Sequence, residues 1–222
     1  MNDKKIEQLK EFIDESNNIV FFGGAGVSTE SNIPDFRSSD GLFSKQLNQH
    51  FSPEELVSHT FYERYPEDFF KFYKDNMIYP DAKPNKAHMA LARLEDQGKL
   101  KSIITQNIDG LHQKAGSKTV YELHGTVNSN TCERCNAKYN LEEFLNLKGN
   151  VPHCSECGAR VKPDVVLIVG GISLVVYPAA GFLSYFKGQY LVLINKSSTM
   201  MDKDANLIIN DSIGSVLDKA IK

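Results

Sequence analysis

Residues 19–37 read IVFFGGAGVSTESNIPDFR, a short apolar run followed at once by a glycine-rich polar loop. An apolar run of this length that ends in glycines indicates a buried strand. The loop after it is too rich in Gly, Ser, Asp and Pro to form a simple helix. A strand that opens directly into such a loop is typical of the ligand edge of an α/β sheet.

The rest of the chain repeats this order of strand and polar loop. Further strands are predicted at 101–105, 119–123, 165–169, 172–176, 190–195 and 206–210. Helices are predicted at about 4–16, from 52, through the aromatic-rich segment 61–77, at about 86–97, from 178 and from 212. Strands that alternate with helices predict a parallel sheet. The polar clusters GAGVS, TQNID, LHG and INKS each follow a strand, so they are expected to converge on one crevice.

Composition excludes several classes of protein. The chain has 222 residues and a formal net charge of −3, without a block of like charge. It therefore lacks the basic surface of a nucleic-acid binder, and no nucleic-acid partner is expected. The N-terminal segment lacks the apolar region of a signal peptide. Residues 165–183 are uncharged, but Gly, Ser and Pro interrupt them, so we expect no membrane span and a cytoplasmic protein.

The four cysteines form the most specific local pattern. Cys132 and Cys135 make one CxxC pair, and Cys154 and Cys157 make a second pair after 18 intervening residues. This spacing predicts a closed, structural zinc site of four thiolates. Two disulfides or free thiols are the alternatives, and the absence of a secretory signal argues against disulfides. His153 is expected at the surface and not as a ligand.

Two other features are weak evidence for a functional site when each is taken alone. Residues 23–26, GGAG, follow a strand, so their backbone N–H groups could approach a pyrophosphate. Thr29 stands where the third glycine of GxGxxG would fall, which leaves a dinucleotide loop and a plain turn both open. His124 follows a strand and could be a general base or a structural histidine. Asn195, at the end of another strand, could serve a ribose hydroxyl.

Together these segments resemble a known family. GGAGVSTESNIPDFR, TQNIDGLH, ELHG, the CxxC pairs, KPDVV, GGISL and LVLINKS are similar to the signature elements of the sirtuins, in the family order, over residues 18–214. The resemblance implies a Rossmann-like parallel-sheet domain with a smaller inserted zinc-binding module. It implies an NAD-dependent protein-lysine deacylase (deacetylase) that acts on acylated-lysine proteins or peptides, with NAD and Zn2+ as cofactors. Residues 1–222 would be one catalytic domain, with the zinc module at about 126–163 and the NAD-binding part at 1–125 and 164–222.

The resemblance also implies roles for single residues. His124 matches the catalytic base, and Asn107 and Asp109 match catalytic positions in the pocket that receives the carboxamide of NAD. The positions that match the cofactor site are Gly24, Ala25, Gly26, Thr29, Phe36, Arg37, Gln106, Ile108, Asp109, Gly171, Ser173, Asn195 and Ile213. In the family chemistry nicotinamide leaves the ribose, the acyl oxygen of the lysine attacks the same carbon, and the base removes a proton from a ribose hydroxyl.

The sequence departs from the family at three places. Asn32 replaces a usual glycine, a mild change because Asn tolerates a left-handed backbone. Ile172 replaces a usual threonine and removes a hydroxyl near the expected phosphates. A block of roughly two dozen residues, about one βα unit, is missing after Leu167, either lost from the chain or omitted from the sequence.

The missing block normally supplies the edge on which the substrate peptide pairs as an added strand. Its absence leaves an active and an impaired deacylase both open. Two alternatives to the deacylase are a mono-ADP-ribosyltransferase, which uses the same cleavage of NAD, and a non-catalytic module that binds zinc and NAD.

Overall fold

The computed structural model describes residues 3–35, 51–165, 186–197, 199 and 202–221. Its elements in chain order are α1 (Asp3–Glu15), β1 (Ile19–Gly23), η1 (Ala25–Val27), η2 (Thr29–Ser31), α2 (Pro53–Leu56), α3 (His59–Arg64), α4 (Pro66–Asn76), α5 (Lys86–Asp96), β2 (Leu100–Thr105), α6 (Leu111–Lys114), β3 (Val120–Glu122), β4 (Gly125–Cys132), β5 (Lys138–Tyr139), α7 (Leu141–Leu145), β6 (Val161–Val165), β7 (Val192–Ile194), η4 (Asp202–Asp204), β8 (Leu207–Ile209) and α9 (Ile213–Ala220).

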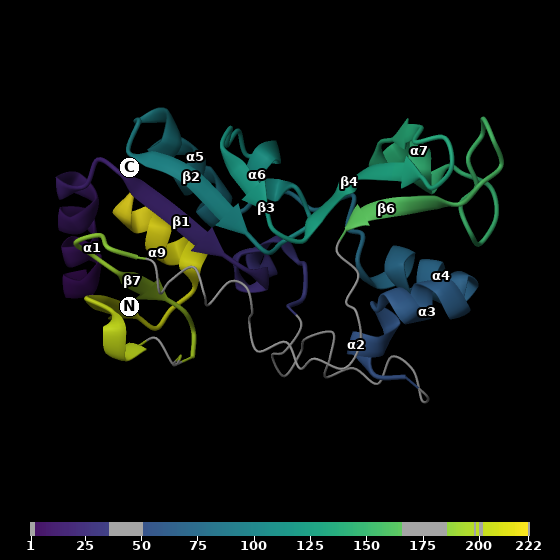
Figure 1. Cartoon of the computed structure of the whole chain (residues 1–222). Helices are drawn as coiled ribbons and strands as arrows, with labels where there is room; N and C mark the ends of the chain where they lie inside the picture. The colour runs from purple at the N-terminus through teal and green to yellow at the C-terminus, as the bar shows by residue number, and fades with distance from the viewer. Residues whose placement is uncertain (1–2, 36–50, 166–185, 198, 200–201, 222) are drawn as a thin grey trace.

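A parallel sheet carries the predicted strands. Strands β1, β2 and β3 pair in this order, and Phe22 lies beside Ile104, which lies beside Tyr121. Strands β7 and β8 form a second parallel pair. The predicted parallel α/β class is therefore confirmed. Because β1, β2 and β3 run in one direction, the segments that follow them all leave from the same edge (Figure 1).

One face of this sheet is closed by helices. The main core consists of apolar residues of α1, α5, α9, β2 and β8, together with Val27 of η1. Ile103 at the centre of β2 is fully buried. The alternate residues face the other side, where Val20 is 55% exposed and Tyr121 is 59% exposed. The described part of the chain therefore covers only one face of the β1–β2–β3 sheet completely.

The helix boundaries follow local signals in the sequence. The side chain of Ser52 caps α2, and Glu55 completes a capping box. Asn85 caps α5 in the same way, and Gly98 with φ +74° follows its end. Asn32 adopts φ 62° after η2, so the expected left-handed backbone at this position is confirmed.

The aromatic-rich segment forms two helices instead of one. Tyr65, with φ −133° and ψ 60°, separates α3 from α4, and Pro66 begins the second helix. Most of the aromatic side chains are core residues, whereas Tyr65 is exposed. Phe69 and Phe70 are buried with ring centroids 5.3 Å apart at nearly right angles.

The cysteine segment is built on an antiparallel sheet in the order β5-β4-β6. Figure 1 places it at the end of the molecule opposite α1 and α9. Its apolar residues share one core with α2, α3 and α4, and this core includes Cys132 and Cys154. The predicted inserted module is confirmed as part of the fold class, whereas its boundaries at 126 and 163 stay a prediction.

The prediction of a parallel strand that begins at Val165 is wrong at its first residue. Val165 is the last residue of β6 and pairs antiparallel with Gly125. Gly125 has φ +76°, and a side chain at this position would collide with the carbonyl oxygen of Asp164. The continuation of this strand, the strand at 172–176, the helix from 178 and the gap after Leu167 lie outside the described residues.

No helix in the described part of the chain is long and apolar enough to span a membrane. Most of the uncharged segment 165–183 lies outside that part.

Candidate functional site

The four predicted metal ligands come together in the cysteine module. The sulfur atoms of Cys132, Cys135, Cys154 and Cys157 all lie within 4.8 Å of one another. Asn136 and Gly158, each directly after the second cysteine of a pair, have positive φ angles of 61° and 74°. This left-handed residue turns each CxxC segment so that both of its sulfurs face the same point.

The sulfur distances fit a zinc ion. Cys132 Sγ lies 3.5 Å from Cys157 Sγ, and Cys135 Sγ lies 3.6 Å from Cys154 Sγ. Tetrahedral zinc with Zn–S bonds of about 2.3 Å separates its sulfur ligands by roughly 3.8 Å. A disulfide would require about 2.05 Å. None of the four cysteines forms a disulfide, so the sulfur geometry fits the zinc prediction and not the disulfide alternative.

Nearby side chains support the thiolate form of this site. The hydroxyl of Tyr139 donates to Cys154 Sγ over 3.1 Å, and this hydrogen bond, together with the backbone N–H groups of Cys157 and Glu156, lowers the pKa of Cys154 to about 6. A thiolate is the form that zinc binds. His153 is exposed, as expected, and its Nδ1 contacts the carbonyl of Gly158 over 3.0 Å.

At the carboxyl edge of the parallel sheet, a buried serine joins two predicted motifs. Asn107 donates from Nδ2 to Ser28 Oγ over 3.0 Å, and Ser28 Oγ donates to Asp109 Oδ2 over 2.7 Å. Asp109 Oδ1 accepts from the backbone N–H of Leu111 over 2.9 Å. Both carboxylate oxygens are therefore held, and the loop after β1 is fixed to the loop after β2.

The glycine loop runs beside this serine. The backbone N–H of Gln106 donates to the carbonyl of Gly23 over 3.0 Å, which aligns the ends of β1 and β2. A side chain at Gly24 would lie 3.3 Å from Oε1 of Gln106, whereas a side chain at Gly26 would meet nothing within 4 Å. The residues of this loop thus leave open space beside the backbone of Gly26, as a ligand approaching the N–H groups requires.

The remaining part of the loop is short and tightly turned. Ala25 and Gly26 lie in η1, and Thr29 begins η2. The hydroxyl of Thr29 donates to the carbonyl of Gly26 over 3.0 Å. This bond ties the two turns together.

His124 lies two residues beyond the end of β3 at the same edge of the sheet. It is half-buried, and burial lowers its pKa, an effect that a hydrogen bond with the backbone of Gln106 partly opposes. The backbone N–H of the preceding Leu123 donates to the carbonyl of Thr105 over 2.9 Å. Burial thus favours the neutral form of His124, which lies beside the segment that contains Asn107 and Asp109.

Among the other predicted site residues, Ile108 is half-buried, and its carbonyl accepts from the backbone N–H of Val127 over 3.0 Å. Asn195 is exposed directly after β7, and its backbone N–H donates to the carbonyl of Ile209 over 3.1 Å. Ile213 is the half-buried first residue of α9. Four further predicted residues lie outside the described residues, and these are Phe36, Arg37, Gly171 and Ser173.

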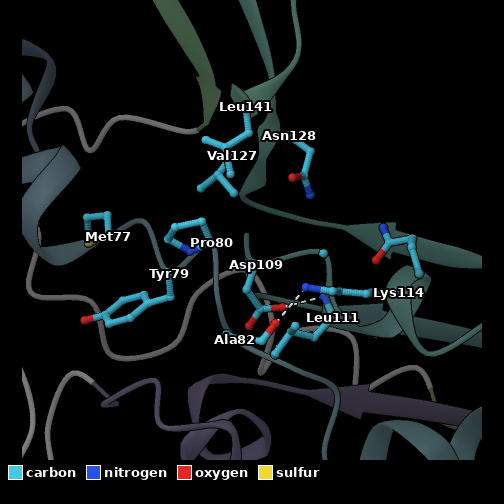
Figure 2. A pocket seen from close by; sticks show the side chains of 12 residues that line it. Met77, Tyr79, Pro80, Ala82, Asp109, Leu111, Lys114, Val127, Asn128 and Leu141 are labelled. Atoms are coloured by element: carbon cyan, nitrogen blue, oxygen red, sulfur yellow. Dashed lines mark hydrogen bonds between the residues drawn. The ribbon is translucent and has the colours of Figure 1, made fainter. Parts of the chain in front are cut away.

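A cavity of about 390 Å3 adjoins Asp109. Figure 2 shows it between the segment 77–82, the start of α6 and the start of β4. The ammonium group of Lys114 donates to the carbonyl of Ala82 over 2.8 Å at its rim. Neither Asn107 nor His124 lines this cavity, so it shares Asp109 with the polar cluster but is not the space in front of it.

Sequence reasoning did not single out Ser28. The GAGVS cluster contains it, but a serine in a polar loop has no signal that separates it from other turn residues. Its burial and its two partners become visible only when the loops after β1 and β2 are brought together.

Comparisons with known proteins agree with this geometry. The Sir2 family model matches residues 24–176. A protein of Clostridium perfringens (strain 13 / Type A) named NAD-dependent protein deacetylase is 60% identical over 243 residues, which cover 99% of each chain. Because 243 aligned residues exceed the 222 of this chain, the relative has at least 21 residues without a counterpart here.

Solved structures are similar over nearly the whole chain. A Sir2 structure with a deacetylated peptide and 3'-O-acetyl ADP-ribose is 34% identical, has a TM-score of 0.85, and covers 98% of this chain and 99% of its own. A complex of a Sir2 homolog with NAD is 35% identical, has a TM-score of 0.82, and covers 96% of this chain and 91% of its own.

Proposed function

Because this chain belongs to the Sir2 family, we propose that the loops after β1, β2 and β3 form the active site of an NAD-dependent protein deacetylase. The protein is an enzyme of this class, and its substrates are acylated-lysine proteins or peptides. The single observation that carries the assignment of the site is the Asn107–Ser28–Asp109 chain of hydrogen bonds beside His124.

Asn107 and Asp109 suit recognition of a carboxamide. An amide side chain offers both a donor and an acceptor, and a carboxylate accepts from an N–H group. The bonds through Ser28 fix both side chains before a ligand arrives, which lowers the entropy lost on binding. We assign Gln106, Ile108 and the loop residues Ala25 and Thr29 to the walls of the same pocket.

His124 is assigned as the general base. A base must be unprotonated at the working pH, and burial lowers the pKa of His124 below its ordinary value of 6.5. The neutral form therefore predominates at pH 7. The acidic limb of the pH profile of kcat/KM is expected below pH 6.5, with activity rising as the pH increases through it and constant above it.

NAD supplies the ribosyl group that accepts the acyl group from lysine. The open space beside the backbone of Gly26 fits a bound phosphate, since no side chain of the described residues occupies it. We assign Gly24 and Gly26 to the phosphates and Asn195 and Ile213 to the adenosine half. Phe36, Arg37, Gly171 and Ser173 keep the roles predicted from the resemblance.

The zinc site is assigned a structural role. Four thiolates complete a tetrahedron and leave no open position for a substrate. Cys132 and Cys154 belong to the core shared with α2, α3 and α4, so the ion would hold this part of the molecule together. We further propose that the enzyme acts in the cytoplasm and has no nucleic-acid partner, in keeping with its net charge of −3.

The test uses an acetyl-lysine peptide with and without NAD. The account predicts NAD-dependent release of nicotinamide together with deacetylated peptide. Transfer of label from NAD to protein without deacetylation would indicate mono-ADP-ribosyl transfer instead. NAD binding without either product would contradict an enzymatic function.

A further inference from the structure

The carboxylate of Glu30 joins the glycine loop to the C-terminal helix. Glu30 lies in η2, two residues after Ser28. Its Oε1 accepts from the backbone N–H of Gly214 over 2.9 Å and from the hydroxyl of Ser212. These partners are more than 180 residues away in the chain and lie at the start of α9.

Glu30 replaces the usual cap of α9. Ser212 occupies the N-cap position, but its side chain accepts no hydrogen bond from the first turn of the helix. The first N–H groups of a helix need an acceptor, and a negative charge is favoured at this end. Glu30 supplies both from another part of the chain.

Gly214 leaves room for the carboxylate of Glu30 because it has no side chain. A side chain at Gly214 would lie 2.5 Å from Oε2 of Glu30 and 2.8 Å from its carboxyl carbon. Only glycine at this position allows the carboxylate to approach the helix so closely. The fit of the two residues means that a change in either one should break the same interaction.

One short loop carries both this contact and the contact of Ser28 with the proposed active site. Ser28 binds Asp109, whereas Glu30 binds the start of α9, next to Ile213. Val27, on the same loop, packs in the core with Val216 and Leu217 of α9. Residues 27–30 therefore bridge the helix that begins at the proposed adenosine half and the carboxylate of the proposed nicotinamide pocket.

We infer that Glu30 is a positioning residue for NAD, which couples the start of α9 to the Ser28–Asp109 contact. This role rests on the proposed function, since it concerns NAD binding at that site. Without Glu30, the loop is held in its binding position in a smaller fraction of the molecules. The apparent affinity falls in proportion to this fraction, although Glu30 does not itself contact NAD.

The test compares NAD affinity, measured by calorimetry, in the full-length parent and its variants. Glu30→Ala is expected to raise the Kd for NAD about tenfold, as for loss of one hydrogen bond to a charged group. Glu30→Gln keeps an acceptor oxygen and should recover part of this affinity. Glu67→Ala, which removes an exposed carboxylate from the first turn of α4, is the matched control and should change the Kd less than twofold.

A second variant separates positioning from helix stability. Gly214→Ala places a better helix former in α9. If the Glu30 contact is irrelevant, this variant should keep the parental NAD affinity, and its melting temperature should be unchanged or higher. If the contact matters, Gly214→Ala weakens NAD binding about as much as Glu30→Ala. The double variant should then be no weaker than either single variant, because both changes break one interaction.

Unchanged NAD affinity in Glu30→Ala, with only a lower melting temperature, would overturn the role of Glu30 and leave the proposed function intact. Fully additive losses in the double variant would also overturn it. Absence of NAD binding by the parent would overturn the proposed function together with the role of Glu30.

Discussion

The buried hydroxyl of Ser28 donates a 2.7 Å hydrogen bond to the carboxylate of Asp109, across 81 positions of sequence. The two residues lie on loops after neighbouring parallel strands, and Asn107 completes the chain of bonds by donating to the same hydroxyl. One small side chain thus determines how two larger polar groups face the space in front of the sheet.

Ser28→Ala should reduce catalysis strongly. The substitution leaves the carboxylate of Asp109 and the amide of Asn107 without their common partner, which costs about 1–3 kcal/mol. The expected result is a loss in kcat/KM of roughly tenfold to a hundredfold in a steady-state deacetylation assay. Ser102→Ala, on β2 away from the loops, is the control and should retain parental kinetics. Parental kcat/KM in Ser28→Ala would show that Asp109 and Asn107 do not depend on this bond.

The histidine pair His88 and His112 should make the protein sensitive to acid. Both rings are buried with centroids 4.7 Å apart, and burial lowers the pKa of each from 6.5 to about 4. Between these values the unfolded chain binds more protons than the folded chain. The two rings therefore make their full contribution to stability above pH 6.5. As the pH drops toward 4, the free energy of unfolding should fall by on the order of 2 kcal/mol for each ring.

Urea unfolding of His112→Leu checks this at pH 7.5 and pH 5. The variant should lose about half of the difference in stability between the two pH values, because one of the two buried rings no longer titrates. His59→Leu, which replaces an exposed histidine, should keep the parental difference. An equal difference in parent and His112→Leu would rule out the buried pair as its source.

Cys132→Ser should release zinc and destabilise more than the cysteine module. A site of three thiolates has an open position, and Cys132 is fully buried in the core shared with α3 and α4. Metal content, expected at about one zinc per parental chain, should fall together with the melting temperature. Lys148→Ser in the same module should change neither quantity. Full zinc retention and normal stability in Cys132→Ser would contradict the structural role.

Much of this fold could be predicted from the sequence because its signals are local. The strands before the polar loops, the cap at Ser52 and the two CxxC pairs depend on residues close together in the chain. The cysteine site follows the same rule in part, since each CxxC turn is local and the antiparallel pairing of β4 with β6 brings the two turns together.

Interactions between distant segments could not be predicted in this way. Ser28 and Glu30 find their partners 81 and 184 residues away, and neither residue carries a pattern that identifies the partner. The break between α3 and α4 was missed because the aromatic periodicity continues across Tyr65 and Pro66. Val165 was assigned to a parallel strand because its apolar run gives no information on strand direction.

Restoring a family-typical segment between Leu167 and Ile168 should increase stability and peptide binding together. At least 21 residues of the relative from Clostridium perfringens have no counterpart in this chain. Val20 and Tyr121 lie exposed on one face of the sheet, and each Å2 of apolar surface that the segment covers contributes ~25 cal/mol.

Melting temperature and peptide Kd of the restored chain are the measurements, with a Gly/Ser segment of equal length at the same position as control. The native-like segment should raise the melting temperature and tighten acyl-lysine peptide binding, with a smaller change in NAD affinity. Equal peptide affinity in the parent and the restored chain would mean that the block is dispensable.

We propose that His124 is the base of an NAD-dependent deacetylation in the site held by Ser28, Asn107 and Asp109. Mass spectrometry of the products formed from NAD and an acetyl-lysine peptide, for the parent and for His124→Ala, tests it most directly. The account predicts acetyl-ADP-ribose and deacetylated peptide in equal amounts from the parent. For His124→Ala it predicts a rate lower by at least about a hundredfold, with NAD affinity within a few fold of parental. A rate in His124→Ala within tenfold of the parental rate would contradict the account.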